Sequence, residues 1–393
     1  MRAIVLMLVS SPVTTDPRLY NEAQALVQSG HQVSVIAWDK LKQNPRKQTW
    51  DGVDVLRLRI CLSPKCGLSL PPWHAFHLLL WQRQAYREAL ALNKEAAFDA
   101  IHCHFLDTLS VGLRLKRKLG VPLIYDARDM YGYMMQASFP RWIARVFERL
   151  EKRWIAEVDV IIAVSEIMRS CLKQITERPI SVIMNCKPLQ STEYQPPDNG
   201  GKFTLLYIGT LHKARALPQL IAAMKNLTGV SCIIGGIGES GYVESIREAC
   251  REIPNVSFVG RVPVDRVLPM TAEADVIFCM FDPGNPNNKI GMPNKIFEAM
   301  ACGRPIICTR GIYSGEFVEK EGIGLAVEYD GEALRQAIIK FRDDPKLRER
   351  MGRKALSAAI STYNWQTEQK KLVELYRDIH DYHRTQKSAG EAG

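Results

Sequence analysis

The stretch of this sequence with the most recognisable chemistry is residues 285–309, NPNNKIGMPNKIFEAMACGRPIICT. Pro293 suits the first turn of a helix, and Gly303 suits the left-handed position just after its end. The pattern therefore predicts a loop, a helix over residues 294–302, a turn and then a buried strand.

The expected loop and the first turn of that helix could together bind an anion. Backbone N–H groups near Gly291 would lie at the positive end of the helix dipole, and Lys295 adds a full positive charge. Glu298 follows three residues later on nearly the same face. A carboxylate suits a ribose diol better than a phosphate, so the set suits a nucleoside diphosphate. An ordinary surface helix with a charged face is the alternative.

The bulk composition allows two globular domains. The chain has 393 residues, of which 46% are hydrophobic and 24% charged, and its formal net charge is +10. This charge attracts nucleotides, nucleic acids and acidic membrane surfaces alike. The apolar run Ala3–Val9 imitates a signal peptide, but the Ser-Ser-Pro that follows favours a buried strand. No stretch reaches the ~18 to 20 apolar residues that span a bilayer.

The ten cysteines are scattered, and no C-x-x-C pair occurs. A chain of this length needs no disulfides, so a reducing, cytosolic compartment is the simpler prediction. Cys103 lies between His102 and His104, but on a strand the two histidines share one face while Cys103 points to the other. We therefore expect no metal site there.

The first half of the chain has the strand and helix pattern of a doubly wound α/β sheet. Ligands of such sheets bind at the carboxyl ends of the strands. Asp16 and Arg18 follow the first strand, His104 ends a later strand, and Asp126 and Arg128 end the next. Asp16, Arg18, Asp126 and Arg128 are therefore candidate ligand contacts, although a helix cap and a surface charge would explain Asp16 and Arg18 equally well.

The pattern also predicts how the domains divide. Residues 187–202 are polar and rich in Pro and Gly, which is typical of a linker, and a second series of strands and helices follows. We expect one Rossmann-like domain over residues 1–195 and another over residues 200–364. A C-terminal helix near residues 365–385 is expected to pack back on the first domain.

Glycines and a cation follow the strands of the second series. Gly209, Gly236, Gly238 and Gly260 are expected in loops, where they would let a flat ligand lie against the backbone. Arg215, in the first of these loops, is available for a phosphate. Several loops on one edge of the sheet would then form a nucleotide site.

A dinucleotide site is an alternative, because residues 236–241 contain G-x-G-x-x-G. That signature needs an acidic residue about 20 positions later, at the end of the next strand. The corresponding residues are Val259, Gly260 and Arg261. The hydride-transfer interpretation is therefore weakly supported.

Residues 140–156, PRWIARVFERLEKRWIA, predict an amphipathic helix. Trp142, Val146 and Trp154 would share an apolar stripe, against several arginines and a lysine. Basic residues and tryptophans at an interface suit an anionic membrane surface. A helix whose apolar stripe packs on the sheet of its own domain is the alternative.

The order of these motifs resembles the family 4 retaining glycosyltransferases of the GT-B fold. The resemblance rests on G-T-L with a later Arg, G-x-G, V-G-R-V, A-D-V and P-N-K-I-F-E-A-M-A-C-G-R-P-I-I, and it covers nearly the whole chain. It implies an α/β protein with two Rossmann-like doubly wound domains that face each other across a cleft.

The resemblance also implies roles for individual residues. Arg215 and Lys295 would neutralise a diphosphate leaving group without a metal or other cofactor, and Glu298 would hold the ribose. Asp126 and Arg128 would line the reaction centre beside Arg215 and Glu298, while Asp16, Arg18 and His104 would lie on the acceptor side. The donor would contact Gly209, Thr210, Arg215, Gly236, Gly238, Val259, Arg261, Gly291, Met292, Pro293, Asn294, Lys295 and Glu298.

The sequence departs from the family pattern at three positions. Ile290 stands where the family often has a glutamate that touches the donor sugar, Thr210 replaces an arginine, and Arg128 replaces a histidine. These departures leave the donor sugar unassigned. Asn287, Asn288 or Lys289 are the candidates to replace the missing glutamate.

The sequence as a whole predicts a retaining glycosyltransferase that moves a sugar from a UDP- or GDP-linked donor to an acceptor hydroxyl. Cell-surface glycan or glycolipid synthesis is the expected setting, with a glycan or lipid-linked acceptor and no nucleic-acid partner. The expected location is cytoplasmic, with peripheral contact to the inner face of the cell membrane. A GT-B sugar-nucleotide epimerase and a non-catalytic nucleotide- or RNA-binding protein are the alternatives.

Overall fold

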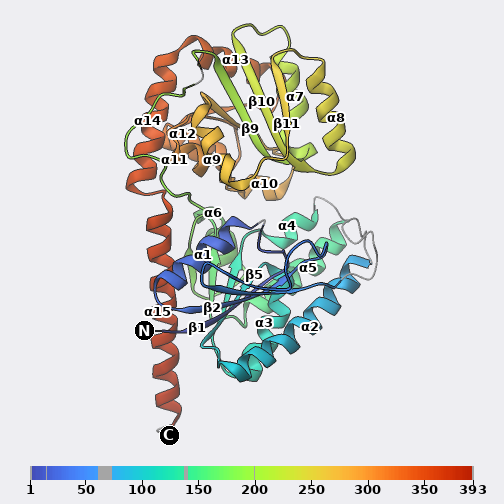
Figure 1. Cartoon of the computed structure of the whole chain (residues 1–393), viewed down its shortest axis with the longest axis vertical. Coiled ribbons are helices and arrows are strands. Elements are labelled where there is room, and N and C mark those ends of the chain that lie inside the picture. Colours follow the sequence, from blue (N-terminus) through green and yellow to red (C-terminus); the bar gives the residue numbers. More distant parts are fainter. Residues whose placement is uncertain (1, 15, 61–72, 137–139, 199, 392–393) are drawn as a thin grey trace. The chain divides into compact units, whose positions relative to one another are not determined.

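The chain folds into two compact units, which are shown in the computed structural model of Figure 1. Unit 1 comprises Met1–Met184 and Gln369–Gly393, and unit 2 comprises Asn185–Glu368. The structure describes all residues except 1, 15, 61–72, 137–139, 199 and 392–393.

Unit 1 is a sheet with the strand order β3-β4-β2-β1-β5-β6-β7-β8. All neighbouring strands are parallel except β3 and β4, which form an antiparallel pair at one edge. Its elements are β1 (Ile4–Val9), α1 (Pro17–Gln28), β2 (Gln32–Trp38), β3 (Lys47–Trp50), β4 (Val53–Leu58), α2 (Trp73–Glu95), β5 (Ala100–His104), α3 (Leu106–Leu119), β6 (Leu123–Ala127), α4 (Tyr131–Gln136), α5 (Arg141–Ile155), β7 (Val160–Ala163), α6 (Glu166–Lys173) and β8 (Ile180–Val182).

The alternation of side chains along β5 separates the two faces of this sheet. His102 and His104 point to one face, where their rings stack with centroids 4.3 Å apart, as the sequence predicted for the histidine pair. Tyr376, on the C-terminal helix α15 (Trp365–Glu391), contacts His102 on this face. Cys103 points the other way, against Gly112 of α3.

Unit 2 is a six-stranded parallel sheet with the order β11-β10-β9-β12-β13-β14. This is the Rossmann order, in which the direction of winding reverses between β9 and β12. Its elements are β9 (Phe203–Leu211), α7 (Leu217–Met224), β10 (Val230–Gly238), α8 (Ser240–Arg251), β11 (Val256–Gly260), α9 (Val264–Glu273), β12 (Val276–Cys279), α10 (Pro286–Ile290), α11 (Asn294–Ala301), β13 (Ile306–Thr309), α12 (Tyr313–Glu321), β14 (Gly324–Val327), α13 (Gly331–Asp343) and α14 (Pro345–Ser361).

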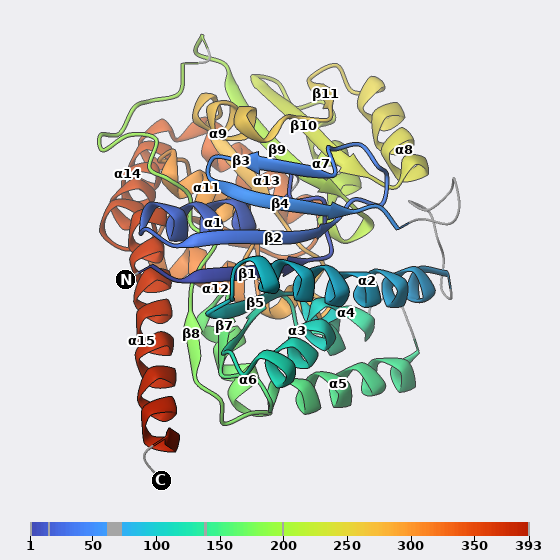
Figure 2. The same ribbon diagram turned by 60° about the horizontal axis from the view of Figure 1, so that its bottom comes forward.

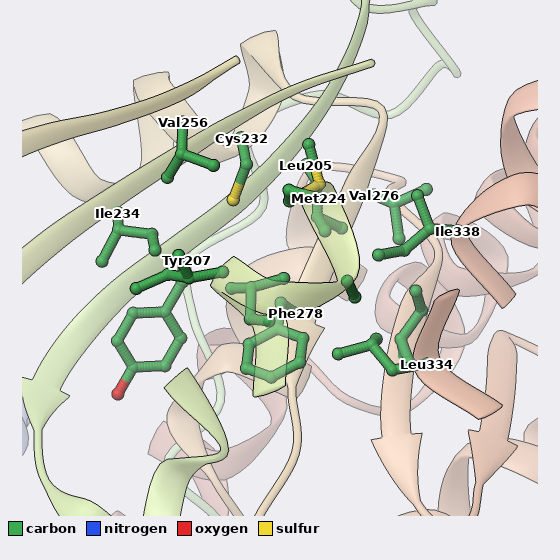
Figure 3. Close-up of a cluster of buried hydrophobic side chains, with 14 of the residues drawn as sticks. Leu205, Tyr207, Met224, Cys232, Ile234, Val256, Val276, Phe278, Leu334 and Ile338 are labelled. Carbon is green, nitrogen blue, oxygen red and sulfur yellow. The ribbon is translucent and has the colours of Figure 1, made fainter. Parts of the chain in front are cut away.

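The core of unit 2 explains why Tyr207 matters for the site described below. Leu205, Tyr207 and Phe278 come from adjacent strands and pack against apolar side chains of α7 and α13. Figure 3 shows the hydroxyl end of Tyr207 pointing away from these neighbours. That hydroxyl donates to the carbonyl of Thr210 at 2.5 Å, so the ring is fixed at both ends.

The division into units comes earlier than the boundary at residue 195 that the sequence suggested. The segment expected to be a linker is tied to unit 2: the Gln190 N–H donates to Ala301, and Arg304 donates to the carbonyl of Gln195. Tyr194 packs between Arg304 and Arg353. Proline and glycine content indicated an irregular backbone correctly, but it carried no information on which core that backbone packs against.

The described helices include none that is both long enough and apolar enough to cross a membrane. No disulfide forms among the described cysteines, and most of them are buried.

Candidate functional site

The residues singled out by the sequence fall into two clusters. The donor cluster lies in unit 2 around Arg215, Lys295 and Glu298. The arginine cluster lies in unit 1 and contains Asp16, Arg18, Glu22, His104, Asp126 and Arg128.

Arg215 lies on a short 3-10 helix, Lys213–Arg215, directly after β9. Its guanidinium stacks on the ring of Phe281, 3.7 Å from the ring centroid. Its Nη1 donates to Asn288 Oδ1 at 3.2 Å and, less favourably, to the carbonyl of Ala214 at 3.4 Å. Within the described residues no carboxylate forms an ion pair with Arg215, so its positive charge is not neutralised by the protein.

Lys295 is held in a similar way in the first turn of α11. Its ammonium lies 4.5 Å from the centroid of the Tyr207 ring. Gly209 makes this position possible, because a Cβ there would lie 2.2 Å from the lysine Nζ. Burial lowers the pKa of Lys295, while Cys279 and Glu298 oppose this shift. Arg215 and Lys295 therefore place two cations with aromatic support on one edge of the sheet.

Glu298 extends the donor cluster along α11. Its Oε1 lies 3.9 Å from the ammonium of Lys187, which is 8% exposed. The N-terminus of α11 has no side-chain cap, so the N–H groups of its first turn have no side-chain acceptor. The sequence missed Lys187 because it begins the segment that was interpreted as a linker, and no local pattern marks it.

The arginine cluster is built on a different principle. Arg18 is 3% exposed and donates from Nε and Nη2 to the two oxygens of Asp126, each at 3.0 Å, and from Nη1 to the Ile183 carbonyl at 2.9 Å. Arg128 donates from Nη1 to both oxygens of Asp16 at 2.8 and 2.7 Å and from Nε to Asp126 at 2.9 Å. Each guanidinium is thus matched by carboxylates.

The charges in this cluster set the pKa values of its acids. Burial alone would raise the pKa of Asp126, but the guanidinium groups of Arg18 and Arg128 hold it well below its usual value. The pKa of Asp16 is lowered in the same way, mainly by Arg128 acting against burial. For Glu22 burial outweighs the attraction of Arg18 and raises the pKa to about 8.

Glu22 is a member of the cluster that the sequence did not predict. It is fully buried, and its carboxylate lies 2.9 Å from Arg18 Nε, 4.0 Å from His102 Nε2 and 3.8 Å from His104 Nδ1. Neither of its oxygens has a hydrogen-bond partner in the described part of the chain. Glu22 follows Arg18 by one helical turn on α1, so the i,i+4 spacing was visible, but its burial was not.

The residue types in this cluster could also hold a metal ion. One ligand atom each from Glu22, His102, His104 and Asp126 lies within 4.8 Å of the others. However, Asp126 already accepts from both Arg18 and Arg128, so a dication there would lie next to two guanidinium groups. The geometry fits a buried ion-pair network better than a metal centre.

The family of the protein follows from comparison with known proteins. Residues 18–189 match the model of Glycosyltransferase Family 4, and residues 202–344 match the model of Glycosyl transferases group 1. The chain belongs to these glycosyltransferases. The first match lies almost wholly in unit 1, and the second lies in unit 2.

One curated relative is the GDP-mannose-dependent monoacylated alpha-(1-6)-phosphatidylinositol monomannoside mannosyltransferase of Corynebacterium glutamicum. It is 29% identical over 165 residues, which cover 41% of this chain and 42% of that protein. Sucrose-phosphate synthase of Thermosynechococcus elongatus superposes with a TM-score of 0.79 at 18% identity, covering 96% and 99% of the two chains. HepE of Anabaena, solved with UDP and glucose, has a TM-score of 0.71 at 16% identity, covering 96% and 100%. These structures identify the GT-B fold of the glycosyltransferase.

The glycine loops of the glycosyltransferase differ from the expectation. Gly209 lies within β9, and Gly236 and Gly238 lie within β10, so both strands run further than the apolar runs suggested. A Cβ at Gly236 would lie 1.7 Å from the Gly209 carbonyl, and one at Gly238 would lie 2.2 Å from the Leu211 carbonyl. These two glycines therefore lie in a strand and not in a loop, and they allow the two strands to approach each other. Their contact with the donor stays a prediction.

The loop expected before α11 is also wrong in part, because Pro286–Ile290 forms the short helix α10. Asn285 caps it by accepting the N–H of Asn287 at 2.9 Å, and the N–H of Gly291 closes it on the carbonyl of Asn288. The Asn-Pro pair was a readable start signal for a helix. The Gly291 N–H is used by this helix, which leaves the first turn of α11 as the source of backbone donors.

Three β-branched side chains are exposed at the end of the sheet where a base was expected to bind. Ile237, Val259 and Val264 are 56%, 45% and 56% exposed. Arg261 and Thr210 are exposed as well, and Thr210 contributes only its carbonyl to a contact within the site. The glycosyltransferase thus presents an apolar shelf beside β10 and β11.

In unit 1, burial changes what the predicted residues can do. Asp126 and His104 are fully buried and Arg18 nearly so, with their polar atoms turned to one another. Burial excludes the alternative that Arg18 is a surface charge, while the roles of Asp126 at the reaction centre and of Arg18 as a ligand contact stay predictions. Arg128 and Asp16, whose side chains are 10% and 9% exposed, are the members that reach the surface of the unit.

Proposed function

We propose that this glycosyltransferase moves a sugar from a UDP- or GDP-linked donor to an acceptor hydroxyl with retention of the anomeric configuration. The observation that carries the proposal is the pair of cations in unit 2, Arg215 and Lys295, which are held by aromatic rings and not by carboxylates. A pair of this kind has its charge available for a dianionic diphosphate.

The donor cluster assigns a part of the donor to each group. The cations and the first turn of α11 would bind the diphosphate, and Glu298 would accept hydrogen bonds from the ribose hydroxyls. The shelf of Ile237, Val259 and Val264 would support the base. Because these cations can stabilise the charge that develops on the leaving diphosphate, we propose that the transfer needs no metal ion.

Two of the similar proteins support this donor class. HepE was solved with UDP and glucose, and the Corynebacterium relative is named for its dependence on GDP-mannose and its phosphatidylinositol monomannoside acceptor. We propose the same broad class here: a nucleotide-linked hexose as donor and a glycan or lipid-linked acceptor, in cell-surface glycan or glycolipid synthesis. Arg128 and Asp16 would take part on the acceptor side of unit 1.

Peripheral contact with the cytoplasmic membrane face is proposed from the surface of α5. This helix packs through Ala144, Glu151 and Ile155, which are buried. Trp142 and Val146, predicted to share the apolar stripe, are instead 67% and 52% exposed. The exposed face of the helix also carries Arg141, Arg145, Arg149, Lys152 and Arg153.

A second helix contributes apolar side chains to this surface. Phe76 and Leu79, near the start of α2, are 46% and 63% exposed. Figure 2 shows α2 and α5 with their first turns at the same end of unit 1. Exposed aromatic and aliphatic groups flanked by arginines fit the interface of an anionic bilayer.

The function is tested by incubating the purified protein with labelled UDP- and GDP-sugars, with and without a membrane extract and with and without a chelator. Transfer to extract lipid or glycan with retained configuration, unaffected by the chelator, is expected. Interconversion of the free donor would indicate an epimerase, and absence of any turnover would indicate a non-catalytic nucleotide- or RNA-binding protein.

Membrane contact is tested separately with vesicles of phosphatidylglycerol and phosphatidylcholine. Sedimentation with the anionic vesicles at low salt is expected, with binding reduced in a Trp142→Ala, Arg145→Ala variant. Lys320→Ala, on α12 of unit 2, is the charge control. Equal recovery with neutral and anionic vesicles would contradict the proposed contact.

A further inference from the structure

Asn288 is one of the three residues that the sequence offered in place of the missing glutamate, and its amide lies beside Arg215. Its side chain is 6% exposed, and it lies on α10 between Arg215 and the turn that follows β12. We propose that Asn288 is a positioning residue: it orients the Arg215 guanidinium for a diphosphate while leaving the charge of that guanidinium intact. This inference rests on the proposed donor class.

The orientation of the amide follows from its two neighbours. Asn288 Oδ1 accepts from Arg215 Nη1 at 3.2 Å, and its Nδ2 donates to the carbonyl of Asp282 at 2.9 Å. A guanidinium can only donate and a carbonyl can only accept, so the reverse orientation of the amide would lose both bonds. Both ends of the amide are thereby engaged by protein.

The backbone around Asn288 is fixed independently of any ligand. Asn285 caps α10, and the Asn288 N–H donates to the Asn285 carbonyl at 3.0 Å. The N–H of Asp282 donates to the Ala214 carbonyl at 3.1 Å, which ties the turn after β12 to the 3-10 helix that carries Arg215. Asn288 therefore joins two segments that are already held together.

The contacts of Arg215 decide which of its N–H groups are available. Nη1 is used by Asn288, and the flat face lies on Phe281. Within the described residues Nε and Nη2 have no hydrogen-bond partner. These two groups form one edge of the guanidinium, with the spacing that binds two oxygens of a phosphate.

The neutrality of Asn288 is the specific point of the proposal. An aspartate at this position would have nearly the same shape and could accept the same bond from Arg215, although it would lose the bond that Nδ2 donates to the Asp282 carbonyl. It would also neutralise the guanidinium and repel a diphosphate, as the carboxylates of Asp16 and Asp126 neutralise the arginines of unit 1. An amide gives the same orientation without that cost to binding.

Three variants test the proposal: Asn288→Asp, Asn288→Ala and Asn285→Asp. The last adds the same charge to the same short helix but keeps the cap, since an aspartate accepts the same N–H. Binding of UDP and GDP is measured by calorimetry at two salt concentrations. Binding of the matching nucleoside is measured by ligand-detected NMR, and thermal unfolding controls for folding.

Asn288→Asp is expected to weaken nucleoside diphosphate binding by about tenfold or more and to reduce its salt dependence, because one cation is neutralised. Asn288→Ala should weaken it several-fold through lost orientation, with the salt dependence retained. The nucleoside should bind each variant within about twofold of wild type, and Asn285→Asp should resemble wild type.

Other outcomes would contradict the inference alone or the proposed donor class together with it. Wild-type protein that binds neither UDP nor GDP overturns the proposed donor class and this inference with it. Wild-type protein that binds one of them, while Asn288→Asp binds it equally well, overturns the inference alone. Equal losses for nucleoside and nucleoside diphosphate would also overturn it, because they would show general damage to the site.

Discussion

The arginine cluster of unit 1 and the donor cluster of unit 2 hold their arginines in opposite ways. In unit 1, Arg18 and Arg128 are enclosed by Asp16, Asp126 and Glu22. In unit 2, Arg215 rests on an aromatic ring and an uncharged amide. The same side chain is therefore neutralised by the protein in one place and left charged in the other.

This difference separates a structural use of charge from a ligand-binding use. A buried guanidinium that is neutralised by carboxylates attracts an anionic ligand only weakly. Removing one of the carboxylates leaves an uncompensated buried charge, which destabilises the fold. A cation held by a ring and an amide has a fixed position and an unmatched charge, which is the condition for binding an incoming anion. Changes in unit 1 should thus affect folding most, and changes in unit 2 should affect donor binding most.

The largest expected effect is that of Asp126→Asn. Asparagine keeps the shape but removes the charge that faces both Arg18 and Arg128, so the variant should lose about 3–5 kcal/mol of folding free energy. All tryptophans except Trp365 lie in unit 1, so intrinsic fluorescence during urea unfolding reports this unit.

The exposed ion pair between Arg117 and Glu157 provides the control for that measurement. Glu157→Gln should change the free energy of unfolding by less than about 1 kcal/mol. A loss for Asp126→Asn no larger than this would show that the buried network is not structural, and the contrast between the units would fail.

The second effect concerns Arg215→Ala and Lys295→Ala. Each removes a charge-assisted contact to the diphosphate, worth about 1.5–3 kcal/mol, so nucleoside diphosphate binding should weaken by at least about tenfold. Stability should change little, since neither cation has a carboxylate partner among the described residues. Calorimetry with UDP and GDP measures the first statement, and thermal unfolding measures the second.

Lys213→Ala is the matched control, because Lys213 lies on the same 3-10 helix as Arg215 and is exposed. It should bind nucleotide nearly as wild type does. Equal losses from all three variants would mean that the net charge of the protein attracts the nucleotide, without a specific site.

The sequence could not predict which arginines are neutralised by carboxylates and which keep their charge. The motif order was sufficient for the fold class, the family and the cluster of Arg215, Lys295 and Glu298, since Pro, Gly and apolar periodicity determine local structure. What failed was the prediction of partners. Arg18 is separated by more than a hundred residues from Asp126, and nothing local announces their contact.

The same reason explains the errors in unit 2. Gly236 was expected in a ligand-binding loop, but it lies in β10 against the carbonyl of Gly209. Gly209 belongs to the neighbouring strand β9 and precedes Gly236 by 27 residues. Lys187 was placed in a linker, although it lies against Glu298. A glycine or a lysine carries the same local signal whether its neighbour is a ligand, a strand or a carboxylate.

The third effect is a dependence of stability on pH through Glu22. Burial raises its folded pKa to about 8, above its ordinary value of 4.5, so the folded protein holds a proton that the unfolded chain releases between these pH values. The stability from this group is complete below pH 4.5 and is lost as the pH rises through about 8. Glu22→Gln keeps the uncharged form at every pH.

The stability of Glu22→Gln relative to wild type should therefore rise between pH 6 and pH 9, by about 2–3 kcal/mol. Urea unfolding at both pH values measures this difference, and the comparison with wild type cancels the other titrating groups of the cluster. Glu95→Gln, at an exposed position, should show no such trend. A constant difference would mean that Glu22 is already ionised at pH 6, paired with Arg18 as the other acids of the cluster are paired.

The smallest effect tests how Lys295 is placed. In Gly209→Ala the added Cβ would lie 2.2 Å from the lysine Nζ and 3.2 Å from its Cε, so the ammonium must leave its position over Tyr207. The end of a lysine moves at little cost, but Gly209 has a φ of +158°, so the alanine also strains the backbone and thermal unfolding must be measured beside binding. Donor binding should weaken only about threefold, because the charge stays nearby but loses its preferred position.

Gly241→Ala, where an added Cβ meets nothing within 4 Å, is the matched control. If Gly209→Ala weakened binding as much as Lys295→Ala, the glycine itself would contact the donor; if it had no effect, the position over the Tyr207 ring would be irrelevant and charge alone would account for the role of Lys295.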